Sequence, residues 1–368
     1  MKVKVVKETQ PWQKKAKSLA RLRLFSGILE VIVLLGLLFA FWWFWPPISV
    51  ILPSNLVAAA AVYFLIIGVS LAIVDFPLAY YREFVLPRRY GLLSQSFGEW
   101  LTDSLRVGLP SFLLLTGMVS LIYFFILESP QWWWLFSWAL IIFLSLLINL
   151  ALPGVILPRF YKLEELKDEG LKERLFLLLK RAGREVKNIY VINLSERGNA
   201  ANAALVGIGS GKKIVLGDNL LGSFTPEEVE VILAHELGHD KHADSYRLFA
   251  FQTLFFLIIL YLTNMLWEFL GLASLADPAG LPLLLLLVSL IMLILLPFFS
   301  FYSRTLEERA DRYALELTQN PDSFISMMTK ITRQNLVSPT PSPLELFFSD
   351  HPSYSRRVAL ATAYKEAS

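Results

Sequence analysis

Two histidines four residues apart, with a glutamate beside the first, are the residues of this chain best suited to chemistry. His235, Glu236 and His239 form the pattern His-Glu-x-x-His. Residues at this spacing share one face of a helix, so both imidazoles can bind a single zinc ion. Glu236 is then placed to take a proton from a water on the metal. The pattern predicts a catalytic site with one Zn²⁺ per chain rather than two unrelated surface histidines.

A third protein ligand must come from elsewhere, because a catalytic zinc has three protein ligands and one open position. A third histidine six residues after His239 is excluded, since that position is Ser245. A glutamate on a later helix is the alternative. Glu307 provides it, with Glu308 as the rival ligand in the same segment. Asp311 lies one helical turn after Glu307 and could accept a hydrogen bond from the far nitrogen of a ligand imidazole.

The histidines need a helix to hold them, and the start of that helix is well marked. Thr225 is a candidate N-cap, Pro226 follows at the first helical position, and Glu228 completes a capping box. We expect this helix to run through His242 and either to end there or to merge with the apolar segment that follows. Upstream of it, the sequence predicts an amphipathic helix and three strands, at 164–183, 188–194, 202–208 and 212–216.

The composition places these elements at a membrane. Of 368 residues, 55% are apolar and only 18% are charged, against roughly a quarter charged in a soluble protein. A membrane-spanning helix needs about 20 apolar residues. Six segments reach that length: 26–45, 56–78, 107–127, 129–158, 248–267 and 278–303. The expected fold is mainly α, a polytopic membrane protein with about six transmembrane helices and a cytoplasmic zincin-like α/β catalytic subdomain.

The distribution of basic residues orients the chain. All 34 lysines and arginines lie in the segments 1–23, 82–106, 159–247 and 304–365. The loops on the opposite side, near 46–55, 128–131 and 268–280, contain none. The positive-inside rule therefore predicts that both termini and the active site face the cytoplasm. The basic N-terminal segment is interpreted as contacting lipid, and no nucleic-acid partner is expected.

The spans divide the chain into four expected parts. They are an N-terminal membrane domain with four spans at 1–158, a cytoplasmic catalytic subdomain with the histidine helix at 159–247, a transmembrane hairpin at 248–303, and a cytoplasmic C-terminal helical part at 304–368. The hairpin returns the chain to the metal, which explains the long gap between His239 and Glu307. Both ligand sets are expected within about 12 Å of the membrane boundary.

Further stretches carry a family resemblance. They are YREFVLPRRYGL at 81–92, LPRFYKLEEL at 157–166, NAALVGIGSGKKIVLGDNLL at 202–221, the His-Glu-Leu-Gly-His helix, the Glu-x-x-Ala-Asp segment, and Asp350-His351-Pro352 followed by Arg357. With them the chain resembles the type I CAAX prenyl endopeptidases, integral-membrane zinc metalloproteases of the gluzincin type. The eukaryotic members have seven spans, and the six spans expected here would correspond to all of them except the first. NAALVG also lacks the aromatic residue of the usual NAYFYG, which bears on substrate preference.

The resemblance implies an activity and further site roles. Asn202 and Ala203 would lie on an edge strand that pairs with the substrate backbone. His351 would donate to the oxyanion, and Arg357 would help to hold the substrate. The implied activity is hydrolysis of peptide bonds in prenylated or membrane-associated polypeptides by a zinc-activated water. The expected partners are a peptide or protein substrate, prenylated or not, and the lipid bilayer.

Two other functions fit the same residues. One is a membrane quality-control protease of the heat-shock type, which degrades misfolded proteins. The other is a non-catalytic transporter or scaffold with a vestigial metal site, although the intact Glu236 argues against it. A peptidase assay with prenylated and unprenylated peptides separates the first from the prenyl protease. Proteolysis that a chelator abolishes would exclude the second.

Overall fold

A computed structural model describes residues 11–44, 50–151, 161–186, 188–196, 198, 203–207, 212–272 and 274–367. Six helices in this part of the chain are long and apolar enough to cross a membrane, which confirms the predicted number. They are α1 (Pro11–Trp43), a helix over 56–89 made of α3 (Leu56–Tyr80), a π-turn (Tyr81–Val85) and α4 (Leu86–Arg89), then α5 (Phe97–Glu128), α6 (Trp133–Ala151), α11 (Asp244–Phe269) and α12 (Leu281–Thr318). Most of the helices extend beyond the predicted spans, because α5 begins at Phe97 rather than 107, the second helix continues to Arg89 rather than 78, and α12 continues to Thr318 rather than 303. The first helix begins well before residue 26, and 152–158 of the predicted fourth span lie outside the described residues.

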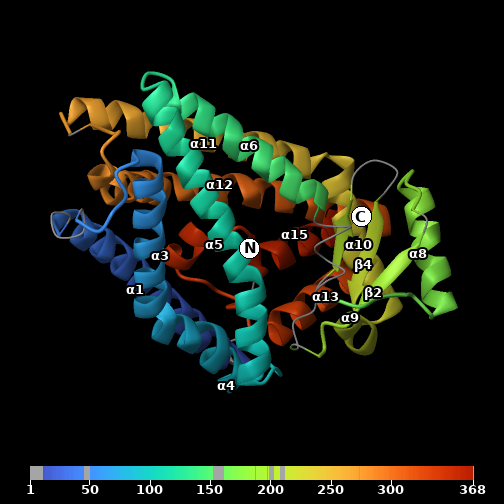
Figure 1. The fold of residues 1–368 in the computed structure, drawn as a ribbon. Helices are drawn as coiled ribbons and strands as arrows, with labels where there is room; N and C mark the ends of the chain where they lie inside the picture. The colour runs from blue at the N-terminus through green and yellow to red at the C-terminus, as the bar shows by residue number, and fades with distance from the viewer. Residues whose placement is uncertain are drawn as a thin grey trace.

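The membrane helices lead into the part of the chain that carries the histidines. Figure 1 shows α6, α11 and α12 running toward α10 (Pro226–Lys241) and the sheet, with the helices of the C-terminal part beside them. Indole N–H groups connect α6 to α11. Trp133 Nε1 donates to Asn264 Oδ1 at 2.7 Å, and Trp138 Nε1 donates to the Thr253 carbonyl at 2.9 Å. These contacts fix α11, whose first residues lie beside the metal centre described below.

A small four-stranded sheet supports the histidine helix. The strands β1 (Leu163–Glu165), β2 (Ile189–Ile192), β3 (Ala203–Val206) and β4 (Lys213–Gly217) lie in the order β1-β2-β4-β3. β2 and β4 are parallel, whereas the two outer strands pair antiparallel with their neighbours. Buried side chains of β2, β4, α8 (Glu169–Arg181) and α10 form one core with the C-terminal helices. β3 is thus an outer strand of the sheet, next to the metal ligands.

The amphipathic helix expected over 164–183 is shorter than predicted. Glu164 and Glu165 belong to β1, which pairs with β2, and the helix begins at Glu169 after Asp168 as N-cap. Its apolar face is formed by four leucines at helical spacing, all of them buried: Leu171, Leu175, Leu178 and Leu179. The periodicity was sufficient to identify the helix, but the pairing of β1 with a strand some 25 residues away was not visible in it.

The histidine helix α10 begins as predicted and ends earlier. The Thr225 side chain accepts from the Glu228 N–H, and the Glu228 carboxylate accepts from the Thr225 N–H, which together form the capping box. The helix ends at Lys241, because Ala243 takes a left-handed conformation with φ of 55°. It therefore does not continue through His242 and does not merge with α11. The C-terminal part contains α13 (Pro321–Gln334), α14 (Pro343–Phe348) and α15 (Tyr354–Ala367).

Candidate metal centre

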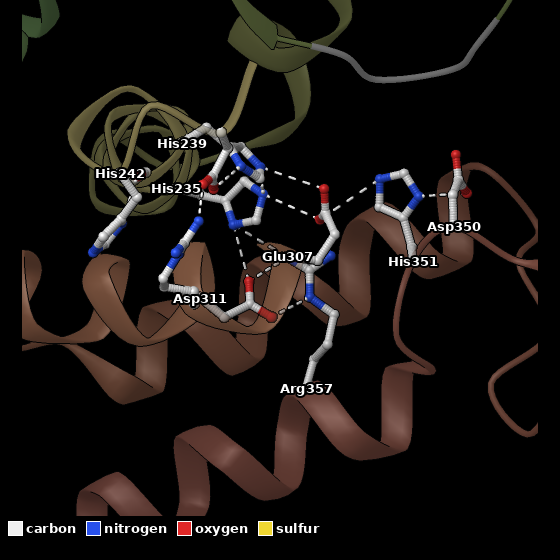
Figure 2. Close-up of polar contacts among 11 residues, drawn as sticks. His235, His239, His242, Glu307, Asp311, Asp350, His351 and Arg357 are labelled. Atoms are coloured by element: carbon white, nitrogen blue, oxygen red, sulfur yellow. Dashed lines mark hydrogen bonds and ion pairs between the residues drawn. The ribbon is translucent and has the colours of Figure 1, made fainter. Parts of the chain in front are cut away.

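Two imidazoles of α10 and one carboxylate of α12 converge on a single point (Figure 2). His235 Nε2 and His239 Nε2 are 3.2 Å apart. Glu307 Oε2 lies 3.4 Å from the first nitrogen, and Oε1 lies 3.3 Å from the second. The three ligand atoms lie within 4.8 Å of one another. Residues separated by almost seventy positions thus offer their metal-binding atoms to the same place.

The spacing and burial of these atoms fit a bound metal. In a tetrahedral zinc site with bonds of about 2.0–2.1 Å, ligand atoms are about 3.3 Å from one another. The observed separations agree with this value. Glu307 Oε2 is also buried, and it makes no hydrogen bond within the described part of the chain. A buried carboxylate oxygen normally has a partner, and a cation between the three groups would supply one.

A glycine allows the two ligand-bearing helices to approach. Gly238 lies between the histidines on α10 and faces Ala310 of α12. A Cβ atom at this glycine would lie 2.9 Å from the Ala310 Cα and 3.1 Å from its carbonyl oxygen. Such distances are shorter than packed carbon atoms tolerate. The glycine inside the His-Glu-Leu-Gly-His motif is thus what lets Glu307 reach the imidazoles, a role that the sequence pattern alone did not indicate.

Asp311 and Arg357 lie behind the first imidazole. Asp311 Oδ1 is 2.9 Å from His235 Nδ1, and Arg357 Nε donates to Asp311 Oδ2 at 2.7 Å. Arg357 Nη2 also lies 3.4 Å from His235 Nδ1. Burial alone would lower the pKa of His235, but the nearby Asp311 and Glu307 carboxylates outweigh it and raise that pKa to about 9. In this structure the Arg357 guanidinium is engaged with Asp311 rather than directed at open space.

The second imidazole has a similar support that the sequence analysis missed. Asp244 Oδ2 lies 3.0 Å from His239 Nδ1, and Arg309 Nη2 donates to Asp244 Oδ1. Asp244 is buried at the first turn of α11. Its position five residues after His239 does not match a helical repeat, so the periodicity of the sequence gave no reason to single it out.

Glu236 projects into the cavity next to the metal ligands. This cavity has a volume of about 430 Å³, and its walls include Glu236, His239 and Glu307 together with residues of α6 and α11. Burial raises the pKa of the Glu236 carboxyl, although the neighbouring imidazoles and a hydrogen bond from the Leu205 backbone oppose it. Leu205 belongs to β3, so the proposed base and the outer strand of the sheet are in direct contact.

His351 approaches the Glu307 carboxylate from the side opposite the two ligand imidazoles (Figure 2). Its Nε2 lies 3.7 Å from Glu307 Oε2, and its Nδ1 lies 2.8 Å from Asp350 Oδ1. The end of the preceding helix, residues 343–348, is held by Arg304 of α12, which donates to the carbonyl of Leu346 at 2.8 Å and also to that of Ser349. Arg304 is a further residue that the sequence pattern did not connect with the site.

The remaining candidates are placed as follows. Glu308 forms an ion pair with Arg356 and does not join the metal-binding group, so Glu307 is the acid that faces the imidazoles. His242 is turned away, with Nδ1 2.8 Å from the Gly238 carbonyl oxygen (Figure 2). Ala203 is the first residue of β3. Asn202, predicted to bind substrate with it, lies outside the described residues.

Two family profiles match nearly the whole chain. Residues 165–365 match peptidase family M48, and residues 6–162 match the CAAX prenyl protease N-terminal region, described as five membrane helices. The M48 match contains the ligand-bearing parts of α10 and α12 as well as β3 and the His351 loop.

Curated proteins show the same relationship. An uncharacterized metalloprotease of Bacillus subtilis, YhfN, is 29% identical over 287 residues, which are 76% of this chain and 67% of that protein. The CAAX prenyl protease 1 homolog of Dictyostelium discoideum is 28% identical over 72% of this chain and 64% of its own length. The CAAX prenyl protease 1 homolog of Arabidopsis thaliana is 27% identical over 86% of this chain and 78% of its own length. The chain thus spans about two thirds of the first two relatives.

The fold also matches a solved structure. The crystal structure of S. mikatae Ste24p superimposes with a TM-score of 0.82, covering 98% of this chain and 91% of that one at 22% sequence identity. At this identity the likeness concerns the fold. The membrane helices and the metal-binding part are therefore arranged as in that protein over nearly their full length.

Proposed function

From the premise that the chain belongs to peptidase family M48 and is a membrane metalloprotease, we propose that it is a zinc-dependent endopeptidase acting on prenylated or membrane-associated polypeptides. The observation that carries the proposal is the convergence of two imidazole nitrogens and the Glu307 carboxylate on one point. Zinc is the metal that suits two neutral imidazoles and one carboxylate at these separations. His235, His239 and Glu307 would hold it.

The residues around the metal have separate tasks in peptide hydrolysis. When bound, zinc would polarise a water and the scissile carbonyl. Glu236 would accept a proton from the attacking water and pass it to the leaving amine, a task that its raised pKa favours. His351 would donate to the carbonyl oxygen as that atom gains negative charge. Ala203, at the start of β3, would pair with the backbone of an extended substrate, as Asn202 would beside it.

The position of the cavity supports a substrate that lies at the membrane. Its walls include Leu146 and Asn149 of α6 and Leu248 and Phe249 of α11, all near the ends of membrane helices. An apolar group attached to a peptide could occupy this region while the peptide reaches the metal. Several relatives named CAAX prenyl protease 1 homologs support a prenylated substrate. The distribution of lysine and arginine supports an active site on the cytoplasmic side.

A peptidase assay tests the substrate class. Matched peptides with and without a C-terminal isoprenyl cysteine are given to the purified full-length protein, with the Glu236→Gln variant as the control. We expect cleavage of the prenylated peptide, loss of cleavage on chelation of zinc, and none by the variant. Equal cleavage of both peptides would count against the prenyl preference and favour the quality-control protease.

Metal analysis of purified variants tests the ligand set. Glu236→Gln is expected to retain one zinc, because Glu236 is the base rather than a ligand, whereas Glu307→Ala is expected to lose it. Glu308→Ala is the matched control, since Glu308 is paired with Arg356 and faces away from the imidazoles. If Glu307→Ala still bound one zinc tightly, Glu307 would not be the third ligand.

A further inference from the structure

We propose that Asp244 and Arg309 form a positioning pair for His239, in which the carboxylate fixes the imidazole and the guanidinium fixes the carboxylate. The proposal rests on the proposed function, in which His239 is a zinc ligand. It concerns the affinity of the site for its metal and assigns neither residue a direct contact with substrate.

The contacts lead outward from the metal-binding point, from His239 to Asp244 and from Asp244 to Arg309. Asp244 Oδ2 lies 3.0 Å from His239 Nδ1, and Arg309 Nη2 donates to the other carboxylate oxygen. Asp244 is only 3% exposed. A carboxylate that accepts from Nδ1 keeps the proton on that nitrogen and leaves the Nε2 lone pair free for a metal. His239 Nε2 is the atom that faces Glu307 and His235.

The other ligand imidazole, that of His235, is likewise supported by a carboxylate and an arginine. His235 Nδ1 contacts Asp311, and Asp311 is held by Arg357. The Nδ1 atom of each ligand imidazole therefore contacts a carboxylate, and each of these carboxylates accepts a hydrogen bond from an arginine. The two arrangements differ in origin. The acid for His235 lies on α12, one turn from Glu307, whereas the acid for His239 comes from the start of α11.

The break between α10 and α11 brings Asp244 to the imidazole. On a continuous helix a residue five positions after His239 would point about 140° away from it. Ala243 interrupts the helix with a φ of 55°, a conformation that residues with a Cβ rarely adopt. A new helix starts after this residue, and Asp244 is the first residue of α11. The carboxylate is also favoured there because helix N-termini attract negative charge. The strained residue thus serves the metal centre.

Arg309 connects this pair to the third ligand. It lies on α12 two residues after Glu307, so one helix carries both the acidic ligand and the cation that holds the carboxylate behind His239. A shift of α12 would therefore move both parts of the site together.

Zinc affinity of the full-length protein, measured by competition with a chelator, tests the pair. We expect Asp244→Ala to weaken zinc binding about 10–100-fold. Asp244→Asn should weaken it less, because its amide oxygen can still accept from Nδ1 and its size is unchanged. We expect Arg309→Gln to have a smaller effect than Asp244→Ala. The absorption spectrum of the cobalt(II)-loaded protein should change in each variant, which a purely structural role away from the metal would not cause.

Asp240→Asn is the matched control. Asp240 is also an acid with a buried side chain, one residue after His239, but it pairs with Arg184 and Lys212 and, within the described residues, contacts no imidazole. Its variant should keep the zinc affinity and cobalt spectrum of the wild type. A double-mutant cycle completes the test, since Arg309→Gln should cost little further affinity once Asp244 is alanine.

Three outcomes would overturn a part of this scheme. Unchanged zinc affinity and cobalt spectrum in Asp244→Ala and Asp244→Asn would overturn the role of Asp244 while leaving the zinc site intact. Additive losses in the double mutant would overturn the coupling to Arg309. A wild-type protein that binds no zinc would instead overturn the proposed function, and this pair with it.

Discussion

Among the imidazoles at the metal centre, His351 is distinguished by its exposure and by its partner. His235 and His239 are held inside the protein between two helices, whereas the His351 side chain is 58% exposed on a loop. The hydrogen bond to Asp350 raises the pKa of His351, although burial of part of the ring opposes it. The imidazole therefore stays protonated to a higher pH than a free histidine, and a protonated imidazole is the stronger hydrogen-bond donor to a developing oxyanion.

The pH dependence of cleavage should report this partnership. Asp350→Asn removes the main cause of the raised pKa, so the protonated form of His351 is lost at a lower pH. We expect the alkaline limb of kcat/KM to move to lower pH in this variant, measured with a peptide that the wild type cleaves. Asp322→Asn is the control, because Asp322 is an exposed acid paired with Lys365. An unmoved alkaline limb in Asp350→Asn would contradict the role given to His351.

At the scale of elements, the contact between α10 and α12 is the basis of the metal centre. α10 brings the two histidines, α12 brings Glu307 and Asp311, and Gly238 and Ala310 allow the helix backbones to touch. The distances between the ligand atoms therefore depend on the contact between Gly238 and Ala310, neither of which is a metal ligand.

A methyl group added at Gly238 should disturb the metal centre through this contact. Gly238→Ala would place a Cβ 2.9 Å from the Ala310 Cα, so the helices must move apart. We expect a stability loss of about 1–3 kcal/mol and weaker zinc binding, measured by thermal unfolding in detergent and by chelator competition. Gly222→Ala is the control, since a Cβ there meets nothing within 4 Å. Wild-type zinc affinity in Gly238→Ala would show that the close approach is not required.

The start of α10 is secured by the same residue that links it to α13. Glu228 completes the capping box and also accepts hydrogen bonds from Lys330 and Ser326 of α13. Although burial opposes ionisation, these partners lower the pKa of Glu228. Its contribution to stability is therefore present above the unfolded-state pKa and is lost as pH falls through the lower folded-state value.

Replacement of the Glu228 carboxylate should lower the free energy of unfolding. Glu228→Gln leaves Lys330 without its buried partner, and we expect a loss of about 1–3 kcal/mol in the free energy of unfolding at neutral pH. Thermal unfolding measures it, and the difference from wild type should shrink as the solution is acidified toward the folded-state pKa. Glu227→Gln is the matched control, because Glu227 pairs with Arg174 at the surface and should cost less than about 1 kcal/mol. Equal losses in both variants would contradict the linking role.

Local signals made some elements predictable, and long-range contacts decided the others. The start of α10 depends on Thr225, Pro226 and Glu228, which are neighbours in sequence, and it was predicted to the residue. Its end depends on Ala243, whose left-handed conformation is supported by the contacts of Asp244 with residues far along the chain. Local periodicity therefore favoured a longer helix. Asp244 and Arg309 escaped attention for the same reason, because neither matches a helical spacing from the ligand that it supports.

For the whole molecule, the bilayer makes the spans predictable. The length of an apolar run is set by membrane thickness rather than by tertiary contacts, so six runs gave six helices. The apolar composition does not predict how far each helix continues beyond the membrane into water. α12 runs unbroken from Leu281 to Thr318, well beyond the last apolar residue of its span, and this extension carries Glu307 and Asp311 to the metal. The helix α12 thus belongs both to the membrane hairpin and to the metal centre.

The absence of cysteine makes the orientation of the whole molecule directly testable. Lys167→Cys places a single thiol in the catalytic part, at an exposed position, and Ser54→Cys places one in the loop between the first two spans, which contains no lysine or arginine. Because basic residues remain on the cytoplasmic side during insertion, an impermeant maleimide added to intact cells should label Ser54→Cys alone. Lys167→Cys should react only after the membrane is opened. The reverse pattern would place the metal centre outside the cytoplasm, so that its substrates would have to reach it from the opposite face of the bilayer.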